Sequence, residues 1–165
     1  MKKRKVLFLD RDGVINNNKA YYIYKPEDFQ LNDGVIEALK QLQKAGFEFI
    51  IVSNQSGIAR EVCSIWDVEK LHVYISKLFL HEDIHILEYY YCTHHPDVSM
   101  CLCRKPSPLL FEKAIARFNI DATTSWMIGD QMRDIEAAAN AGIKGILVEP
   151  NKNLLYVLPT ILTHD

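Results

Sequence analysis

Five short apolar runs alternate along the chain with longer segments in which apolar residues recur at helical spacing. The runs occupy residues 6–10, 47–52, 86–91, 125–128 and 145–148. They are rich in β-branched and aromatic residues and short for core helices, so each is expected to be a buried strand.

Four segments between the runs have the pattern of amphipathic helices. The first opens at Asp33-Gly34 and closes at Gly46, a residue typical of helix ends. Residues 66–80 and 134–141 are expected to form two more, and another is expected to start with Ser107 as N-cap and Pro108 in its first turn. Alternating strands and helices predict one α/β domain over residues 1–165, a Rossmann-like doubly wound parallel sheet.

Composition and charge exclude several classes of protein. The 165 residues have a formal net charge of -2, which gives no broad attraction for nucleic acid. The apolar run behind the basic start is too short for a signal peptide, and no stretch is long enough to span a membrane. We therefore expect a cytoplasmic monomer that binds a small molecule, with neither nucleic acid nor membrane as partner.

Polar residues stand directly after four of the predicted strands. In sheets of this kind, ligands bind at the carboxyl ends of the strands near a switch in strand order. Asp10, Ser53, Cys92 and Asp130 occupy such positions and are therefore candidate site residues.

Asp10 and Asp12 form an Asp-x-Asp pair at the end of the first strand. In extended chain, residues two apart point the same way, so both carboxylates are expected to address one site. Mg²⁺ prefers such oxygen ligands and often partners a substrate phosphate. One carboxylate would attack phosphorus while the other moves the proton. A surface turn with two solvated acids is the alternative interpretation.

Three later motifs fit phosphate and metal binding. The loop Ser53-Asn54-Gln55-Ser56-Gly57 offers a hydroxyl and backbone N–H groups to phosphate oxygens, although its composition also suits a plain turn. Arg104 and Lys105 offer a fork and a point charge to phosphate, or are solvated surface cations. Asp130 can complete a metal shell, and Asp134 can orient Lys105 or a metal-bound water. As an alternative, these acids simply complement a helix N-terminus.

Taken in order, these motifs resemble those of the haloacid dehalogenase superfamily over nearly the whole chain. The resemblance implies Asp10 as nucleophile, Asp12 as general acid and base, and Ser53 and Lys105 as phosphoryl-binding residues. It also implies Mg²⁺ held by Asp10, Asp130 and the backbone carbonyl of Asp12, with water as final acceptor. Transfer to another acceptor and a non-catalytic binding module are the alternatives.

A cysteine- and histidine-rich segment, residues 92–103, predicts a zinc-binding loop. Thiolates and imidazole suit tetrahedral zinc, and a filled shell indicates a structural role. The expected ligands are Cys92, His94, Cys101 and Cys103, with His95 as the alternative to His94. Such a clip would position Arg104 and Lys105, which follow it directly. Cys63 is distant in sequence and is expected to be a free thiol.

The zinc loop and its flanks resemble two related phosphatase families. One acts on D-glycero-D-manno-heptose 1,7-bisphosphate, in the synthesis of ADP-heptose for lipopolysaccharide core, and the other on histidinol phosphate. The segment from Ser53 to Arg60 favours the heptose family. Three residues depart from its usual pattern: Glu61 replaces Gly, Gln131 replaces Lys, and Ser53 replaces Thr.

Neither gap between the motifs has room for a large cap domain. Residues 16–30 and the zinc loop are left to shape the entrance. Asn18, Tyr21 and Tyr22 are candidate sugar contacts or packed surface, and Asn54, Gln55 and Arg104 are further candidate substrate-binding residues.

Overall fold

The computed structural model describes residues 3–163 and is built on a parallel sheet of five strands. The strands lie in the order β3-β2-β1-β4-β5, so the chain starts centrally, moves to one edge and then crosses to the other side. Their carboxyl ends share one edge of the sheet, with the switch in strand order between β1 and β4. The strands are β1 (Val6–Leu9), β2 (Glu48–Asn54), β3 (Ile86–Cys92), β4 (Trp126–Gly129) and β5 (Lys144–Leu147).

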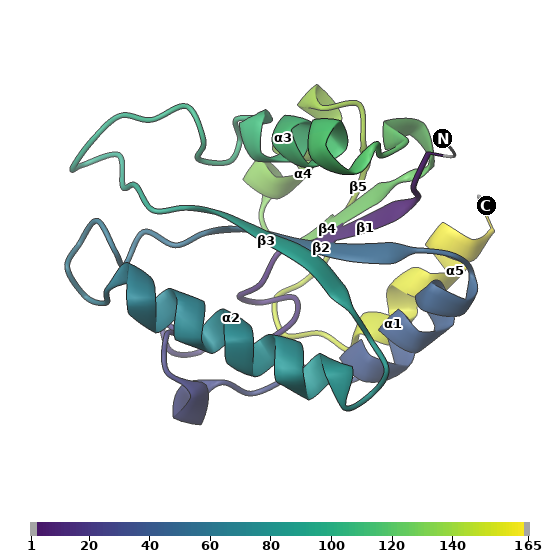
Figure 1. Cartoon of the computed structure of the whole chain (residues 1–165), viewed down its shortest axis with the longest axis horizontal. Coiled ribbons are helices and arrows are strands. Elements are labelled where there is room, and N and C mark those ends of the chain that lie inside the picture. The colour runs from purple at the N-terminus through teal and green to yellow at the C-terminus, as the bar shows by residue number, and fades with distance from the viewer. Residues whose placement is uncertain (1–2, 164–165) are drawn as a thin grey trace.

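Helices cover both faces of the sheet, as Figure 1 shows. One face carries α1 (Val35–Lys44), α2 (Ile65–Leu80) and α5 (Leu158–Leu162). The other carries α3 (Leu109–Phe118) and α4 (Met132–Asn140). Single 3₁₀ turns occur at η1 (Pro26–Asp28), η2 (Ala122–Thr124) and η3 (Leu154–Val157). The predicted doubly wound α/β sheet, without a large cap, is confirmed.

The central strand divides its side chains between two buried clusters. Leu7 and Leu9 pack in the cluster beneath α1 and α2, while Val6 and Phe8 pack in the cluster beneath α3 and α4. This alternation follows from the pleat, because successive side chains of a strand point to opposite faces. All four are fully buried, and each such side chain contributes roughly 1.5–3 kcal/mol of burial free energy.

Capping residues shift some helix boundaries from the predicted ones. Helix α4 begins at Met132 rather than at residue 134, because Gln131 and Asp134 form a capping box at its start. Pro108 occupies the cap position of α3, where Ser107 was predicted. The Ser107 hydroxyl instead donates to the carbonyl of Leu102, so it ties the helix start to the loop before it.

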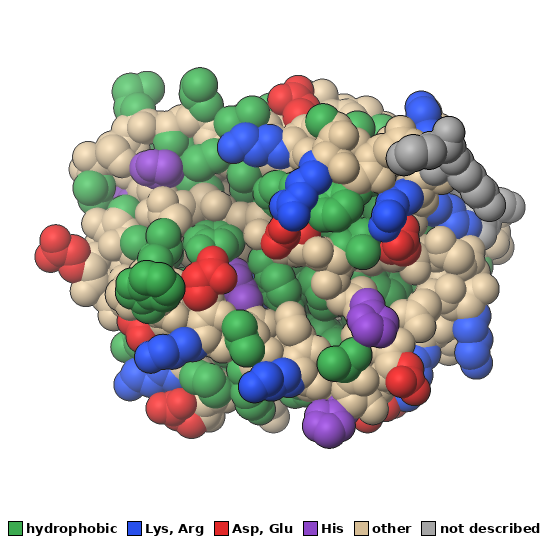
Figure 2. Space-filling model, viewed as in Figure 1, with side chains coloured by type: hydrophobic (Ala, Val, Ile, Leu, Met, Phe, Trp, Pro, Cys, Tyr) green, Lys and Arg blue, Asp and Glu red, His purple; other side chains and the backbone are tan. Residues whose placement is uncertain are grey.

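A C-terminal element was missed by the sequence analysis. η3 and α5 bury Leu154, Val157 and Ile161 in the same cluster as α1. Among the described residues, none forms a helix of the length and apolar character needed to cross a membrane. On the face drawn in Figure 2, basic and acidic side chains are interspersed.

Candidate active site and zinc centre

A buried lysine joins the acids at the carboxyl edge of the sheet. Lys105 Nζ lies 2.9 Å from Asp10 Oδ1 and 2.7 Å from Asp134 Oδ1. It also donates to the carbonyl of Val52 at 2.7 Å and is only 2% exposed. Carboxylate oxygens of Asp10, Asp130 and Asp134 lie within 4.8 Å of one another. Three motifs that are far apart in sequence therefore meet at one point.

The charges of this cluster do not balance. Burial raises the pKa of Asp10 to about 7, although Lys105 opposes the change, and burial also raises the pKa of Asp130. Burial alone would lower the pKa of Lys105, but Asp10 and Asp134 more than offset this and raise it. Three clustered carboxyl groups are thus accompanied by one ammonium, which pairs with Asp10 and Asp134. A hard divalent cation with oxygen ligands, such as Mg²⁺, fits this surplus of negative charge.

Two glycines allow the acids to approach. A Cβ at Gly129 would lie 2.3 Å from Cβ of Asp134, and a Cβ at Gly13 would lie 2.4 Å from Oδ2 of Asp130. Gly13 also has φ +91°, a left-handed conformation that side chains disfavour. Both positions exclude a side chain because the acids fill that space.

Asp12 lines the same cavity as Asp10, but for a different reason from the predicted one. β1 ends at Leu9, so strand alternation does not extend to Asp12. The chain turns instead, and the backbone N–H groups of Ile15 and Asn16 donate to the carbonyl of Arg11. The Asp12 carboxylate accepts from side chains of Arg11, Asn16 and Gln55.

Two amide side chains, at the end of β2 and at the start of the loop after it, hold other site residues. Asn54 Oδ1 accepts from the Lys105 backbone N–H at 3.1 Å, and its Nδ2 donates to the Lys105 carbonyl at 3.3 Å. Gln55 Nε2 donates at 3.1 Å to both Asp12 Oδ2 and Ser53 Oγ. Both residues line the cavity, but these hydrogen bonds give their amides a part in aligning Ser53, Lys105 and Asp12.

A cavity of about 350 Å³ opens over the cluster. It includes the predicted Asn18, Tyr21, Tyr22 and Arg104, although Tyr21 is 86% exposed. The cavity is also lined by residues that the sequence did not predict to bind substrate, among them Tyr24, Cys63, His95, Gln131 and Arg133.

Asn151 is a further residue that the sequence analysis missed. Its side chain exchanges hydrogen bonds with Asn18, and its backbone N–H donates to the carbonyl of Gly13. It lies four residues beyond the end of β5, so a search for polar residues directly after strands does not select it. It ties the entrance loop to the Asp-x-Asp turn.

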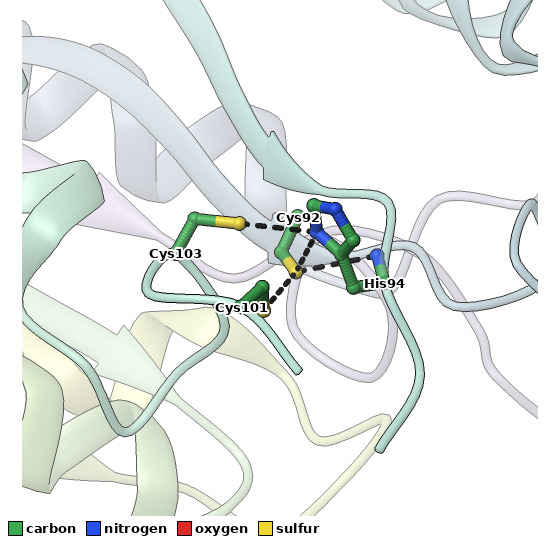
Figure 3. A group of neighbouring side chains, drawn as sticks. All are labelled: Cys92, His94, Cys101 and Cys103. Atoms are coloured by element: carbon green, nitrogen blue, oxygen red, sulfur yellow. Dashed lines mark hydrogen bonds between the residues drawn. The ribbon is translucent and has the colours of Figure 1, made fainter. Parts of the chain in front are cut away.

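The four predicted zinc ligands converge at the end of β3 and in the loop before α3 (Figure 3). Cys92 Sγ lies 3.7 Å from Cys101 Sγ and 3.6 Å from His94 Nδ1, which is 3.4 Å from Cys103 Sγ. Zinc–ligand lengths predict tetrahedron edges of about 3.8 Å between sulfurs and about 3.6 Å between sulfur and nitrogen. The donor set and its spacing therefore fit zinc.

His95 and Cys63 lie outside this group. His95 Nδ1 accepts from the Asp97 backbone N–H at 3.1 Å, and its Nε2 lies 3.0 Å from Arg60 Nη2. Arg104 connects the zinc loop to the cavity, because its Nη1 donates to the His94 carbonyl at 3.1 Å.

An acid after β1, a hydroxyl near the end of β2, a lysine before α3 and a Gly-Asp-x3-Asp motif that starts at the last residue of β4 define a hydrolase of the haloacid dehalogenase type. The Hydrolase_like family model ("HAD-hyrolase-like") matches residues 102–154. The D-glycero-D-manno-heptose-1,7-bisphosphate 7-phosphatase of Chlorobaculum tepidum is 38% identical over 93% of this chain and 82% of its own.

Two further comparisons agree. D-glycero-beta-D-manno-heptose-1,7-bisphosphate 7-phosphatase of Escherichia coli K12 is 39% identical over 88% of this chain and 80% of its own. The crystal structure of the D,D-heptose 1,7-bisphosphate phosphatase of B. bronchiseptica, complexed with magnesium and phosphate, has a TM-score of 0.83 at 27% identity, covering 98% of this chain and 87% of that one. The chain belongs to the haloacid dehalogenase-like phosphatases, in the family of the heptose-1,7-bisphosphate 7-phosphatases.

Proposed function

We propose that this chain, acting as a single domain over residues 1–165, removes the C7 phosphate of D-glycero-D-manno-heptose 1,7-bisphosphate through a phospho-aspartate on Asp10. The observation that carries the proposal is the contact of Lys105 with both Asp10 and Asp134 at the floor of a cavity of about 350 Å³. The relatives named above support the choice of substrate.

In the first step a carboxylate oxygen of Asp10 attacks phosphorus, and the bond from phosphorus to the sugar oxygen breaks. Asp12 gives its proton to that oxygen, so the sugar leaves as an alcohol. Lys105 balances charge on the transferring phosphoryl group, and the Ser53 hydroxyl donates a hydrogen bond to it. Asn54 keeps the lysine in place through both of its backbone groups.

In the second step water attacks the phosphorus of the aspartyl phosphate, and the bond to Asp10 breaks. Asp12, now a carboxylate, takes a proton from this water. Inorganic phosphate leaves, and both acids return to their starting states, so the cycle is balanced without another reactant.

Asp10 and Asp130 would hold Mg²⁺, together with the backbone carbonyl of Asp12. The fit rests on the three clustered carboxylates and the raised pKa values of Asp10 and Asp130. When bound, the ion neutralises charge on the phosphate oxygens during transfer. Asp134 would act indirectly, by orienting Lys105.

The second phosphate of the substrate needs a cation that is free to bind it. Lys105 is already paired with two acids, and Gln131 is neutral, with its amide 3.4 Å from Asp130 Oδ2. Arg104 and Arg133 both line the cavity. We assign the second phosphate to these two guanidinium groups, with Arg133 supplying the charge that Gln131 lacks.

Zinc held by Cys92, His94, Cys101 and Cys103 would fix the loop that carries Arg104 and Lys105. The four cysteines are free thiols, which suits zinc binding and a cytoplasmic enzyme. We expect the enzyme to be a monomer.

Turnover of heptose 1,7-bisphosphate and of histidinol phosphate, compared with Mg²⁺ present, tests the proposal. We expect kcat/KM to be higher for the bisphosphate by a factor of ten or more, because one additional charge-assisted contact contributes roughly 1.5–3 kcal/mol. A preference for histidinol phosphate would overturn the substrate assignment while leaving the chemistry of Asp10 in place.

A further inference from the structure

Arg11 lies between the two acids of the Asp-x-Asp motif and is fully buried, with 0% exposure. Strand alternation would turn its side chain away from both acids. Instead, the guanidinium folds back onto Asp12: Nε lies 3.2 Å from Oδ1, and Nη2 lies 3.0 Å from Oδ1 and 2.8 Å from Oδ2. Nη2 also donates to the Ile23 carbonyl at 2.6 Å.

Arg11 and Asp12 differ in how deeply they are buried. The Asp12 side chain is 29% exposed and lines the cavity, whereas the Arg11 side chain is completely enclosed. Enclosing a guanidinium is costly unless it is paired and hydrogen-bonded. The arrangement therefore places a fixed cation behind an acid that faces the substrate.

The surroundings of Arg11 leave Asp12 as its counter-ion. His72 and Tyr89 stack with ring centroids 4.3 Å apart. Burial, followed by the charge of Arg11, lowers the pKa of His72 to about 3, so the ring is neutral. Among the described residues, neither ring nitrogen of His72 nor Nη1 of Arg11 has a hydrogen-bond partner.

We propose that Arg11 is the positioning residue of Asp12, an inference that rests on the proposed acid–base role of Asp12. The fork fixes the plane of the carboxylate, which Asn16 and Gln55 then complete with donors at 3.0 and 3.1 Å. The guanidinium also forms an ion pair with the negative charge that remains on Asp12 after the proton has moved to the leaving oxygen. Asp12 is then ready to accept a proton from water.

Leaving-group dependence distinguishes this role from a purely structural one. A sugar alkoxide needs a proton as it leaves, whereas p-nitrophenolate does not, and kcat/KM reports steps up to the first irreversible one. We expect Arg11→Met to lower kcat/KM about 100-fold for the sugar phosphate, since misplacement of a catalytic group by about 1 Å costs that much. For p-nitrophenyl phosphate we expect a loss of only a few-fold. Arg11→Lys, which keeps the charge without the fork, should recover part of the difference.

Two reference variants complete the experiment. Arg4→Met removes an exposed arginine paired with Glu48 and should leave kcat/KM unchanged for both substrates. In an Asp12→Asn background, Arg11→Met should cause no further loss of kcat/KM that is specific to the sugar phosphate. Equal losses on both substrates, or no loss, would overturn the role of Arg11. An Asp12→Asn variant without leaving-group dependence would instead overturn the acid–base assignment itself, and the Arg11 proposal with it.

Discussion

Replacing Asp10 by Asn should abolish turnover and, in Mg²⁺-free buffer, stabilise the fold at alkaline pH. Asp10 is 8% exposed, shares the Lys105 ammonium with Asp134, and lies within 4.8 Å of Asp130. Burial, and then these like charges, raise its pKa from 3.8 to about 7 against the opposing effect of Lys105. Asn keeps the shape, can present Oδ1 to Lys105, and carries no charge.

The sign of the pH dependence follows from proton binding. Between pH 3.8 and about 7 the folded protein holds a proton on Asp10 that the unfolded chain has released. Stability from this group is therefore lost as pH rises through that window and is constant above it. Each pKa unit corresponds to about 1.4 kcal/mol, so ionising Asp10 in the fold costs on the order of 4 kcal/mol.

Urea unfolding at pH 5 and pH 8 measures this cost. The buffer contains no added Mg²⁺ and no chelator, so that zinc is not removed from its site. From pH 5 to pH 8 the wild type should lose a few kcal/mol more than Asp10→Asn, by the reasoning above. Glu27→Gln, which removes an exposed acid in η1, should behave as the wild type. Added Mg²⁺ should restore stability to the wild type at pH 8 by binding the folded state.

Identical pH dependences in the wild type and Asp10→Asn would refute this reasoning. They would mean that the buried carboxylates are not crowded enough to cost free energy, and the electrostatic case for a divalent cation would fail.

Three more variants test other parts of the account. Cys101→Ser should lower bound zinc, measured by elemental analysis, together with kcat and the thermal midpoint, whereas Cys63→Ser, outside the zinc group, should leave bound zinc unchanged. Gly129→Ala places a Cβ 2.3 Å from Cβ of Asp134, so we expect a loss of about 1–3 kcal/mol in urea unfolding and of more than tenfold in kcat; wild-type values would contradict it. Arg133→Gln should lower kcat/KM about tenfold for the bisphosphate but not for a sugar monophosphate, and equal effects would remove Arg133 from the second-phosphate site.

The centre of the sheet was predictable because β1, β2 and β4 are covered on both faces and so appear as apolar runs. The same strands indicated where candidate site residues would gather, since Asp10 and Asp130 follow strands, and Ser53 lies near the end of one, at a shared edge of the sheet. η3 and α5 were not predictable from periodicity because each is shorter than the pattern needs.

Other features depend on how the backbone turns. His94 and His95 are both near Cys92 in sequence, and only the path of the chain brings His94 Nδ1 within 3.6 Å of Cys92 Sγ. The contact of Arg11 with Asp12 depends even more strongly on the path of the backbone. Its position between two acids suggests a side chain directed away from the site, but the turn after β1 returns its guanidinium to Asp12. Local spacing does not encode such a contact.

Acid-quenched mass spectrometry during the first turnover tests the covalent chemistry of Asp10 most directly. With Mg²⁺ and heptose 1,7-bisphosphate, we predict a hydroxylamine-sensitive phosphoryl group on the peptide that contains Asp10. It should form before free phosphate and be absent from Asp10→Asn, which should also be inactive. Turnover without a phosphorylated Asp10, or an active Asp10→Asn variant, would contradict the account.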